Sequence, residues 1–242
     1  MLFEPSRAST LAASRLRCVR SGAASLHLKT RFYDAIVGHG AEVRDTIAAN
    51  ACVVLDLACA GAGGYRALLD KIYLRTYDEN ELYRATLRLA GKLDSQPFFD
   101  TKLASRLNLM RNWEVLNYIE VLLLELCEYN FLIRCPHVAL RRLDAALSMS
   151  AATFATANGK IKDCVLKGLL CEYESEAIAV ASLCRALDCP VSVLHTQMTK
   201  KNVPLAPRVA IQAGLILARE LRRKRAAVTT PTTERAARRR GF

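Results

Sequence analysis

Cysteine and histidine are the side chains of this 242-residue chain that could bind a metal ion or act as nucleophiles. The nine cysteines stand in apolar stretches and form no CxxC pair. Cys135-Pro136-His137 and the pair Cys184 and Cys189 come nearest to half of a zinc site, but neither has a matching second half. The four histidines, at positions 27, 39, 137 and 195, have no acidic partner at a catalytic spacing. We therefore predict reduced, buried thiols in a non-secretory compartment, with no metal centre and no catalytic acid–base pair.

Residues 53–64, VVLDLACAGAGG, are the one segment whose pattern is compatible with cofactor binding. An apolar run with Asp56, followed by a glycine-rich turn, resembles the first motif of S-adenosylmethionine-dependent methyltransferases. That fold requires a second buried strand with an acidic end about 20 residues further on. Residues 74–83, LRTYDENELY, are too polar for such a strand. A helix that ends in a flexible turn accounts for the same residues, so we expect no cofactor and no enzyme, with a methyltransferase as an alternative.

Positive charge is concentrated at the two ends of the chain, whose formal net charge is +12. Residues 1–31 hold six Lys/Arg and one acid, residues 219–242 hold nine and two, and residues 32–218 hold twenty of each. A basic tail binds RNA phosphates by releasing counterions; an anionic membrane surface and nuclear import are the alternatives. The candidate RNA-binding residues are Arg222, Arg223, Lys224, Arg225, Arg235, Arg238, Arg239 and Arg240 in the tail, and Lys160, Lys162, Lys200 and Lys201 in expected loops of the body. For the body lysines, solvated loop charge is an equally good interpretation.

The elements that carry these residues are predicted to be helices. Apolar residues recur at helical spacing, as in Leu82, Ala85, Leu89 and Leu93, and no series of alternating strands is found. Turn residues interrupt this pattern at 61–64, 94–97, 134–136, 158–159 and 188–190. No apolar run reaches about 18 residues without a charge. The sequence therefore predicts an all-α fold without a membrane span.

A repeated tetrapeptide suggests how the helices are arranged. Leu-Cys-Glu-Tyr occurs at residues 126–129 and again at 170–173, each time at the end of an apolar helix. Four segments can be aligned as helix, turn, helix, namely 53–72, 87–107, 122–143 and 165–187. We therefore expect a right-handed, α-solenoid-like array of about four to five antiparallel helix pairs. An irregular helical domain with a chance match is the alternative.

The first residues are typical of an organellar targeting segment. Residues 1–31 are rich in Arg, Ser and Ala and contain a single acid, as in mitochondrial or plastid transit peptides. A basic first helix of the mature protein is the alternative. The predicted organisation is a transit peptide or N-terminal arm over 1–31, a helical-repeat domain over 32–220 and a disordered basic tail over 221–242.

The repeated unit of apolar helix, Leu-Cys-Glu-Tyr, turn and Leu-rich helix resembles the degenerate repeats of organellar RNA-associated proteins. These include FAST-kinase-like, octotricopeptide and pentatricopeptide arrays and helical subunits of mitochondrial ribosomes. The resemblance spans about residues 50–190, without the polar pairs that read bases in coded arrays and without a RAP-type module. It implies a non-catalytic subunit of a mitochondrial ribonucleoprotein in the matrix, whose partners are RNA and other subunits and which has no small-molecule substrate. A protein–protein scaffold without RNA contact is a further alternative.

Overall fold

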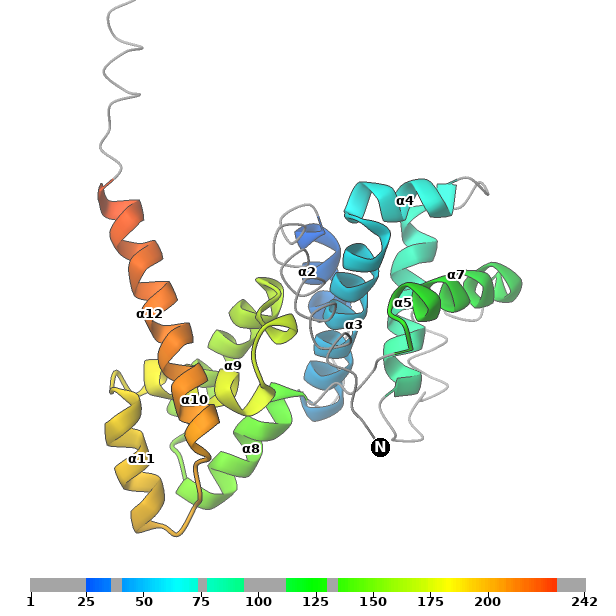
Figure 1. Ribbon diagram of the computed structural model, residues 1–242. Coiled ribbons are helices and arrows are strands. Elements are labelled where there is room, and N and C mark those ends of the chain that lie inside the picture. The colour runs from blue at the N-terminus through cyan, green and yellow to red at the C-terminus, as the bar shows by residue number, and fades with distance from the viewer. Residues whose placement is uncertain (1–24, 36–40, 74–77, 94–111, 130–134, 230–242) are drawn as a thin grey trace, which may run out of the picture.

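The computed structural model describes residues 25–35, 41–73, 78–93, 112–129 and 135–229, and these form helices joined by short links (Figure 1). Within these ranges there are ten α-helices, one short 3-10 helix and no strand, which confirms the predicted all-α class for this part of the chain. The helices form two groups, one around α3 (Ala41–Ala62) and one around α10 (Ser175–Ala186). Both central helices are rich in Ala, whose small side chain lets several neighbours approach closely.

The first group packs around α3. Its helices are α2 (Leu26–Ala35), α4 (Tyr65–Tyr73), α5 (Glu79–Leu93) and α7 (Trp113–Leu126). At Gly61, near the end of α3, an added Cβ would lie 2.1 Å from the carbonyl oxygen of Leu126. Since no Cβ tolerates that distance from a backbone atom, the glycine is what allows the end of α7 to meet α3.

The second group packs around α10. Its helices are α8 (Pro136–Leu147), α9 (Ala151–Leu166), α11 (Val191–Lys200) and α12 (Pro207–Thr229), with the 3-10 helix η1 (Leu169–Cys171) between α9 and α10. The two groups share contacts through α3, which touches α8, α9 and η1, and through α2, which touches α9. One core therefore runs through both groups.

The two copies of the tetrapeptide differ in conformation. In the first, Leu126 ends α7, and Glu128 and Tyr129 have left-handed φ values of 53° and 54°. In the second, Leu170 and Cys171 end η1, and Glu172 has a φ of −105°. Because identical residues adopt different turns, the tetrapeptide does not mark structurally equal repeats, and the solenoid-like array stays a prediction.

One expected turn is wrong. Asn158 and Gly159, predicted to break the chain, lie inside α9. The Asn158 side chain instead bonds to His137 and Asp45, from α8 and α3. A tertiary contact thus stabilises the helix where local propensity favours a turn.

Helices cross both predicted segment boundaries, and the division itself stays a prediction. Residue 31 falls within α2, where Leu28, Lys29 and Phe32 are fully buried, so the folded body begins by Ser25. At the other end, α12 continues to Thr229, past the predicted start of the tail at 221. Residues 1–24 and 230–242 lie outside the described part of the chain.

By length and composition alone, α3 passes as a membrane span over Asp45–Ala62, which the sequence patterning did not predict. Of that window, 78% is buried inside the protein, and the core helix of a globular protein passes the same test. Helices α10 and α11 pass only when taken together, and they meet at 102°. The packing around α3 agrees with its position in the core.

Candidate nucleic-acid interface

The basic tail residues predicted to bind RNA begin on α12. Pro207 stands at the start of this helix, where its missing N–H costs no hydrogen bond. Val209, Ala213 and Ile216 recur at helical spacing and are buried, and α12 packs on α10. This apolar stripe fixes the first half of α12 on the body.

Ion pairs secure the same half of α12. Glu220 is buried, and its carboxylate lies 2.5 Å from Nη1 of Arg185 and 3.7 Å from Nζ of Lys167. Arg219 Nη1 donates to Glu172 Oε2 at 2.5 Å, and Arg208 Nε lies 2.6 Å from Glu174 Oε1. The cations in this half of α12 therefore face carboxylates of the body.

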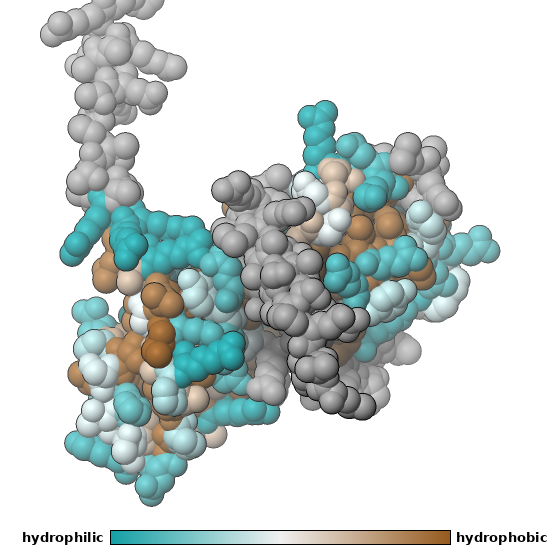
Figure 2. Space-filling model, in the orientation of Figure 1, coloured by the Kyte–Doolittle hydropathy of each residue, from teal (hydrophilic) through white to brown (hydrophobic). Residues whose placement is uncertain are grey.

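The next turn of α12 differs. Arg222, Arg223 and Arg225 are exposed, and Lys224 lies on the same helical segment. Figure 1 shows the end of α12 extending away from the other helices, and Figure 2 shows hydrophilic residues gathered there. Arg235, Arg238, Arg239 and Arg240 lie outside the described residues. The three described arginines are thus accessible at the surface, where a polyanion can reach them.

The four candidate lysines of the body differ in their surroundings. Lys162 Nζ lies 4.9 Å from the centre of the Tyr33 ring and 3.9 Å from Asp34 Oδ1, so it packs against α2. Lys201 Nζ donates to the carbonyl of Leu147, the last residue of α8, at 2.7 Å. Lys200 is exposed at the end of α11.

Lys160 lies beside α12. It lines an open groove of about 700 Å³ between α12 and the corner that joins α10 to α11. Arg185, Asp188 and Glu220 line the same groove, so its charge is mixed. A groove of this composition offers RNA phosphates no dominant positive field.

The methyltransferase-like segment has a different geometry from the one cofactor binding requires. Residues 53–62 are helical within α3, so Asp56 does not end a strand. Its carboxylate forms an ion pair with Lys29, and both side chains are almost completely buried. Burial raises the pKa of Asp56 to about 6, while the Lys29 ammonium acts to lower it. Asp56 therefore binds α2 to α3, a structural contact that leaves no open carboxylate for a ribose.

Gly168, just after α9, packs against the same buried ion pair. Its φ is +74°, and an added Cβ would lie 3.3 Å from Oδ2 of Asp56. Lys29 Nζ also lies 3.4 Å from the carbonyl oxygen of Leu166. Lys29, counted from sequence among the cations of a transit peptide, is thus a structural residue.

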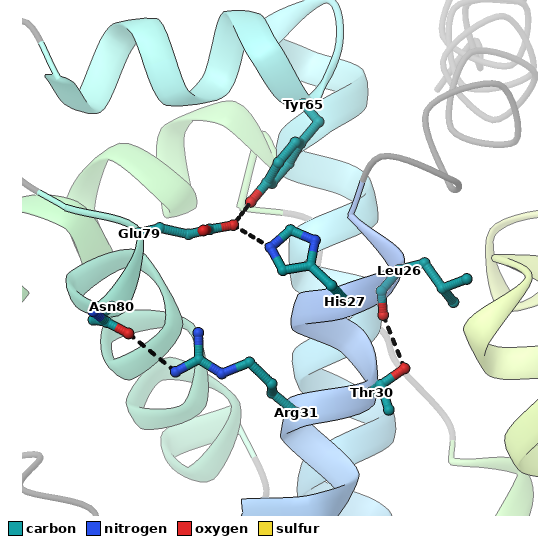
Figure 3. A network of polar contacts seen from close by, with 7 residues as sticks. All are labelled: Leu26, His27, Thr30, Arg31, Tyr65, Glu79 and Asn80. Carbon is teal, nitrogen blue, oxygen red and sulfur yellow. Dashed lines mark hydrogen bonds and ion pairs between the residues drawn. The ribbon is translucent and has the colours of Figure 1, made fainter.

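Helix α2 is further held by a network at the surface, shown in Figure 3. Glu79, the first residue of α5, accepts hydrogen bonds from Tyr65 of α4 and His27 of α2. Arg31 Nη2 donates to Asn80 Oδ1 at 3.0 Å. Burial acts to raise the pKa of Glu79, but the hydrogen bonds from Tyr65 and His27 lower it overall. The network fastens α2 to two neighbouring helices.

A second polar cluster, buried between the two helix groups, was missed from sequence. His137 of α8 is 1% exposed, and its Nδ1 lies 2.6 Å from Oδ1 of Asn158 while its Nε2 lies 3.3 Å from the hydroxyl of Tyr33. Asn158 Nδ2 donates to Oδ2 of Asp45 at 2.9 Å. Burial lowers the pKa of His137, so its ring is neutral at physiological pH. These side chains join α2, α3, α8 and α9, and no sequence spacing signals them.

Other site chemistry is sparse within the described residues. No group of three or more His, Cys, Asp or Glu there could hold a metal ion. A scan against models of known protein families finds no match to this chain, and a search of curated proteins finds no similar sequence. The interpretation of the site therefore rests on its residues and their geometry.

Proposed function

We propose that the protein is a non-catalytic, RNA-associated structural component of a mitochondrial ribonucleoprotein, either a subunit of the mitochondrial ribosome or a member of an RNA-processing complex. The observation that supports this most strongly is the division of α12. Its first half is packed and ion-paired, whereas Arg222, Arg223 and Arg225 are exposed on its last turns.

Such an arrangement favours contact with phosphate over reading of bases. Successive helical residues are rotated by about 100°, so the consecutive arginines cannot all face one base edge. They can neutralise phosphates on different sides of the helix. Together with the cations of residues 230–242, they give residues 219–242 a net charge of +7 against a neutral body.

The first test is the salt dependence of binding to single-stranded RNA. If five to seven tail cations neutralise phosphates, log Kobs should fall against log salt with a slope of about −3.5 to −5. Replacing the four residues Arg222, Arg223, Lys224 and Arg225 by Gln should flatten the slope by about three units, at roughly 0.7 per contact.

A matched control is the double variant Arg208→Gln with Arg219→Gln. It removes two cations from the same helix, but both are paired with glutamates in the body. We expect its slope to equal that of the unaltered protein. An unchanged slope in the fourfold tail variant, or an equal loss in the control, would contradict a phosphate site at the end of α12.

The second test concerns the complex and the compartment. A tagged chain is expected to co-sediment with a large particle from a mitochondrial matrix lysate, and ribonuclease should shift it to lighter fractions. Sedimentation that ribonuclease leaves unchanged, or absence from the matrix fraction, would count against the proposal.

A scaffold that binds protein without RNA is the second candidate function. It is favoured by Ile211 and Leu215 on α12, which are 66% and 55% exposed. A right-handed, solenoid-like stacking of the helix pairs would present further surfaces of this kind. Ile211→Asp with Leu215→Asp should then release protein partners, and the unaltered protein should not bind single-stranded RNA. Protein partners that stay bound to this double variant would contradict the scaffold.

A further inference from the structure

The end of α10 brings two cysteines together. Asp188, two residues past the helix, has a left-handed φ of 48°, and the backbone N–H of Cys189 donates to the carbonyl of Cys184 at 2.9 Å. This is the six-residue closure of a Schellman motif, in which the side chains of the first and last residues meet. Cys184 and Cys189 occupy those two positions, and after burial the neighbouring Cys189 is the next cause that raises the pKa of the Cys184 thiol.

Access distinguishes Cys189 from the other thiols. Of the eight cysteines in the described part of the chain, Cys189 alone is not buried. It lines the groove between α12 and the α10–α11 corner, and so does its partner Cys184. A small oxidant in solvent therefore reaches Cys189 first.

The two thiols also differ in their surroundings. Burial raises the pKa of Cys184 to about 12, so it remains a protonated thiol at neutral pH. The charged residues that line the groove beside the two cysteines are Lys160, Arg185, Asp188 and Glu220. Burial also raises the pKa of Cys59 and Cys127 to about 12 and of Cys164 to about 11, which suppresses competing reactions.

We propose that Cys184 and Cys189 are a redox modification site that forms a reversible disulfide when the protein meets a peroxide. The Cys189 thiolate attacks one peroxide oxygen and breaks the O–O bond, giving a sulfenic acid and, after protonation, one water. The sulfur of Cys184 then attacks the sulfenic sulfur, loses its proton and displaces a second water. Both thiols are oxidised, with loss of two electrons in total, and hydrogen peroxide is reduced to two waters.

The bond would tie the last turn of α10 to the residue before Pro190, where α11 begins. The chain bends there by 102° from α10 to α11, and α12 forms the opposite wall of the groove. Figure 1 shows α10, α11 and α12 in this part of the fold. Oxidation thus fixes the corner covalently and removes the one accessible described thiol from the groove. A thiol reductant restores the starting state.

The experiment is peptide mapping of the full-length protein after brief treatment with hydrogen peroxide, with free thiols blocked in acid before digestion. Trypsin cleaves after Arg185, so a Cys184–Cys189 disulfide joins peptide 168–185 to peptide 186–200. We expect this linked species to form with peroxide and to disappear with dithiothreitol.

Peptide 168–185 also contains Cys171, so two variants assign the bond. Cys171→Ser should retain the linked species, and Cys184→Ser should lose it and leave Cys189 as a sulfenic acid that dimedone traps. The proposal is overturned if the link survives in Cys184→Ser, or if peroxide converts Cys189 to a sulfinic acid while Cys184 remains free. It is equally overturned if Cys189 stays an alkylatable thiol throughout.

Discussion

The α3 group and the α10 group solve the same packing problem but place their charges differently. Each surrounds a helix of small residues, yet the α3 group buries an ion pair, Lys29 with Asp56, at its centre. The α10 group has ion pairs at its edge, such as Arg208 with Glu174, where both partners keep contact with water. The cost of leaving a charge unpaired grows with its burial. We therefore expect substitution of one partner to be costly in the buried pair and nearly neutral in the exposed pair.

The largest effect is expected from breaking the buried pair on one side. Asp56→Ala leaves the Lys29 ammonium buried without a counter-charge and should reduce the free energy of unfolding by about 3–5 kcal/mol. Lys29→Met combined with Asp56→Leu removes both charges and should cost much less. Urea unfolding followed by circular dichroism, with the fluorescence of the single tryptophan, Trp113, as a second probe, measures both variants.

The same variants also test whether the glycine-rich segment, residues 53–64, binds a cofactor. We expect calorimetry to detect no binding of S-adenosylmethionine to the unaltered protein. Binding that is present and abolished by Asp56→Ala, in a protein that remains folded, would favour the methyltransferase alternative. A double variant as unstable as Asp56→Ala would contradict the buried-pair argument.

The second largest effect is expected at Gly61 in the α3 group, and Gly159 in the α10 group serves as the comparison. Gly61→Ala places a methyl group on the carbonyl of Leu126 and should destabilise the protein by about 1–3 kcal/mol. Gly159→Ala in α9 meets nothing within 4 Å and should stabilise it by about 0.5–1 kcal/mol, because alanine has the higher helix propensity. Thermal unfolding of both variants checks the signs; equal shifts would mean that α7 does not approach α3 as described.

The third effect is a pH dependence at the boundary between the groups. Since the folded-state pKa of His137 lies below its unfolded value of about 6.5, the unfolded chain binds a proton that the folded protein resists. The contribution of His137 is thus fully present above about pH 6.5 and is lost as the pH falls towards the folded-state pKa. The free energy of unfolding of His137→Gln and of the unaltered protein is measured in urea at several pH values. The difference between them isolates the contribution of His137, because the other titratable groups are present in both proteins. Parallel curves would show that His137 is not a buried neutral ring.

The smallest effect is expected at the edge of the α10 group. Arg208→Gln removes an ion pair whose Arg side chain is 76% exposed, and the free energy of unfolding should fall by no more than about 0.2–1 kcal/mol. High salt should reduce the difference further. A loss as large as that of Asp56→Ala would show that α12 is held by charge and not by its apolar stripe.

Local pattern was sufficient for the helices themselves. The stripe of Leu82, Ala85 and Leu89 predicted α5, and Pro136 and Pro207 stand at the starts of α8 and α12. The arginines at the end of α12 were also named from sequence, because a run of cations is visible without any partner. Their contact with RNA remains a prediction.

Tertiary structure alone decided which charged residues are structural. Lys29 was indistinguishable from the other cations of a targeting segment until α2 packed it against Asp56. Lys162 and Lys201 contact the Tyr33 ring and the Leu147 carbonyl, which only the packed helices bring beside them, and their contact with RNA stays a prediction. His137 bonds to Tyr33 across 104 positions of the chain. The sequence by itself determined helical segments and the sign of the charge at each end, since both depend on neighbouring residues; the fate of each charge depends on burial and on distant partners, which exist only once the helices have packed.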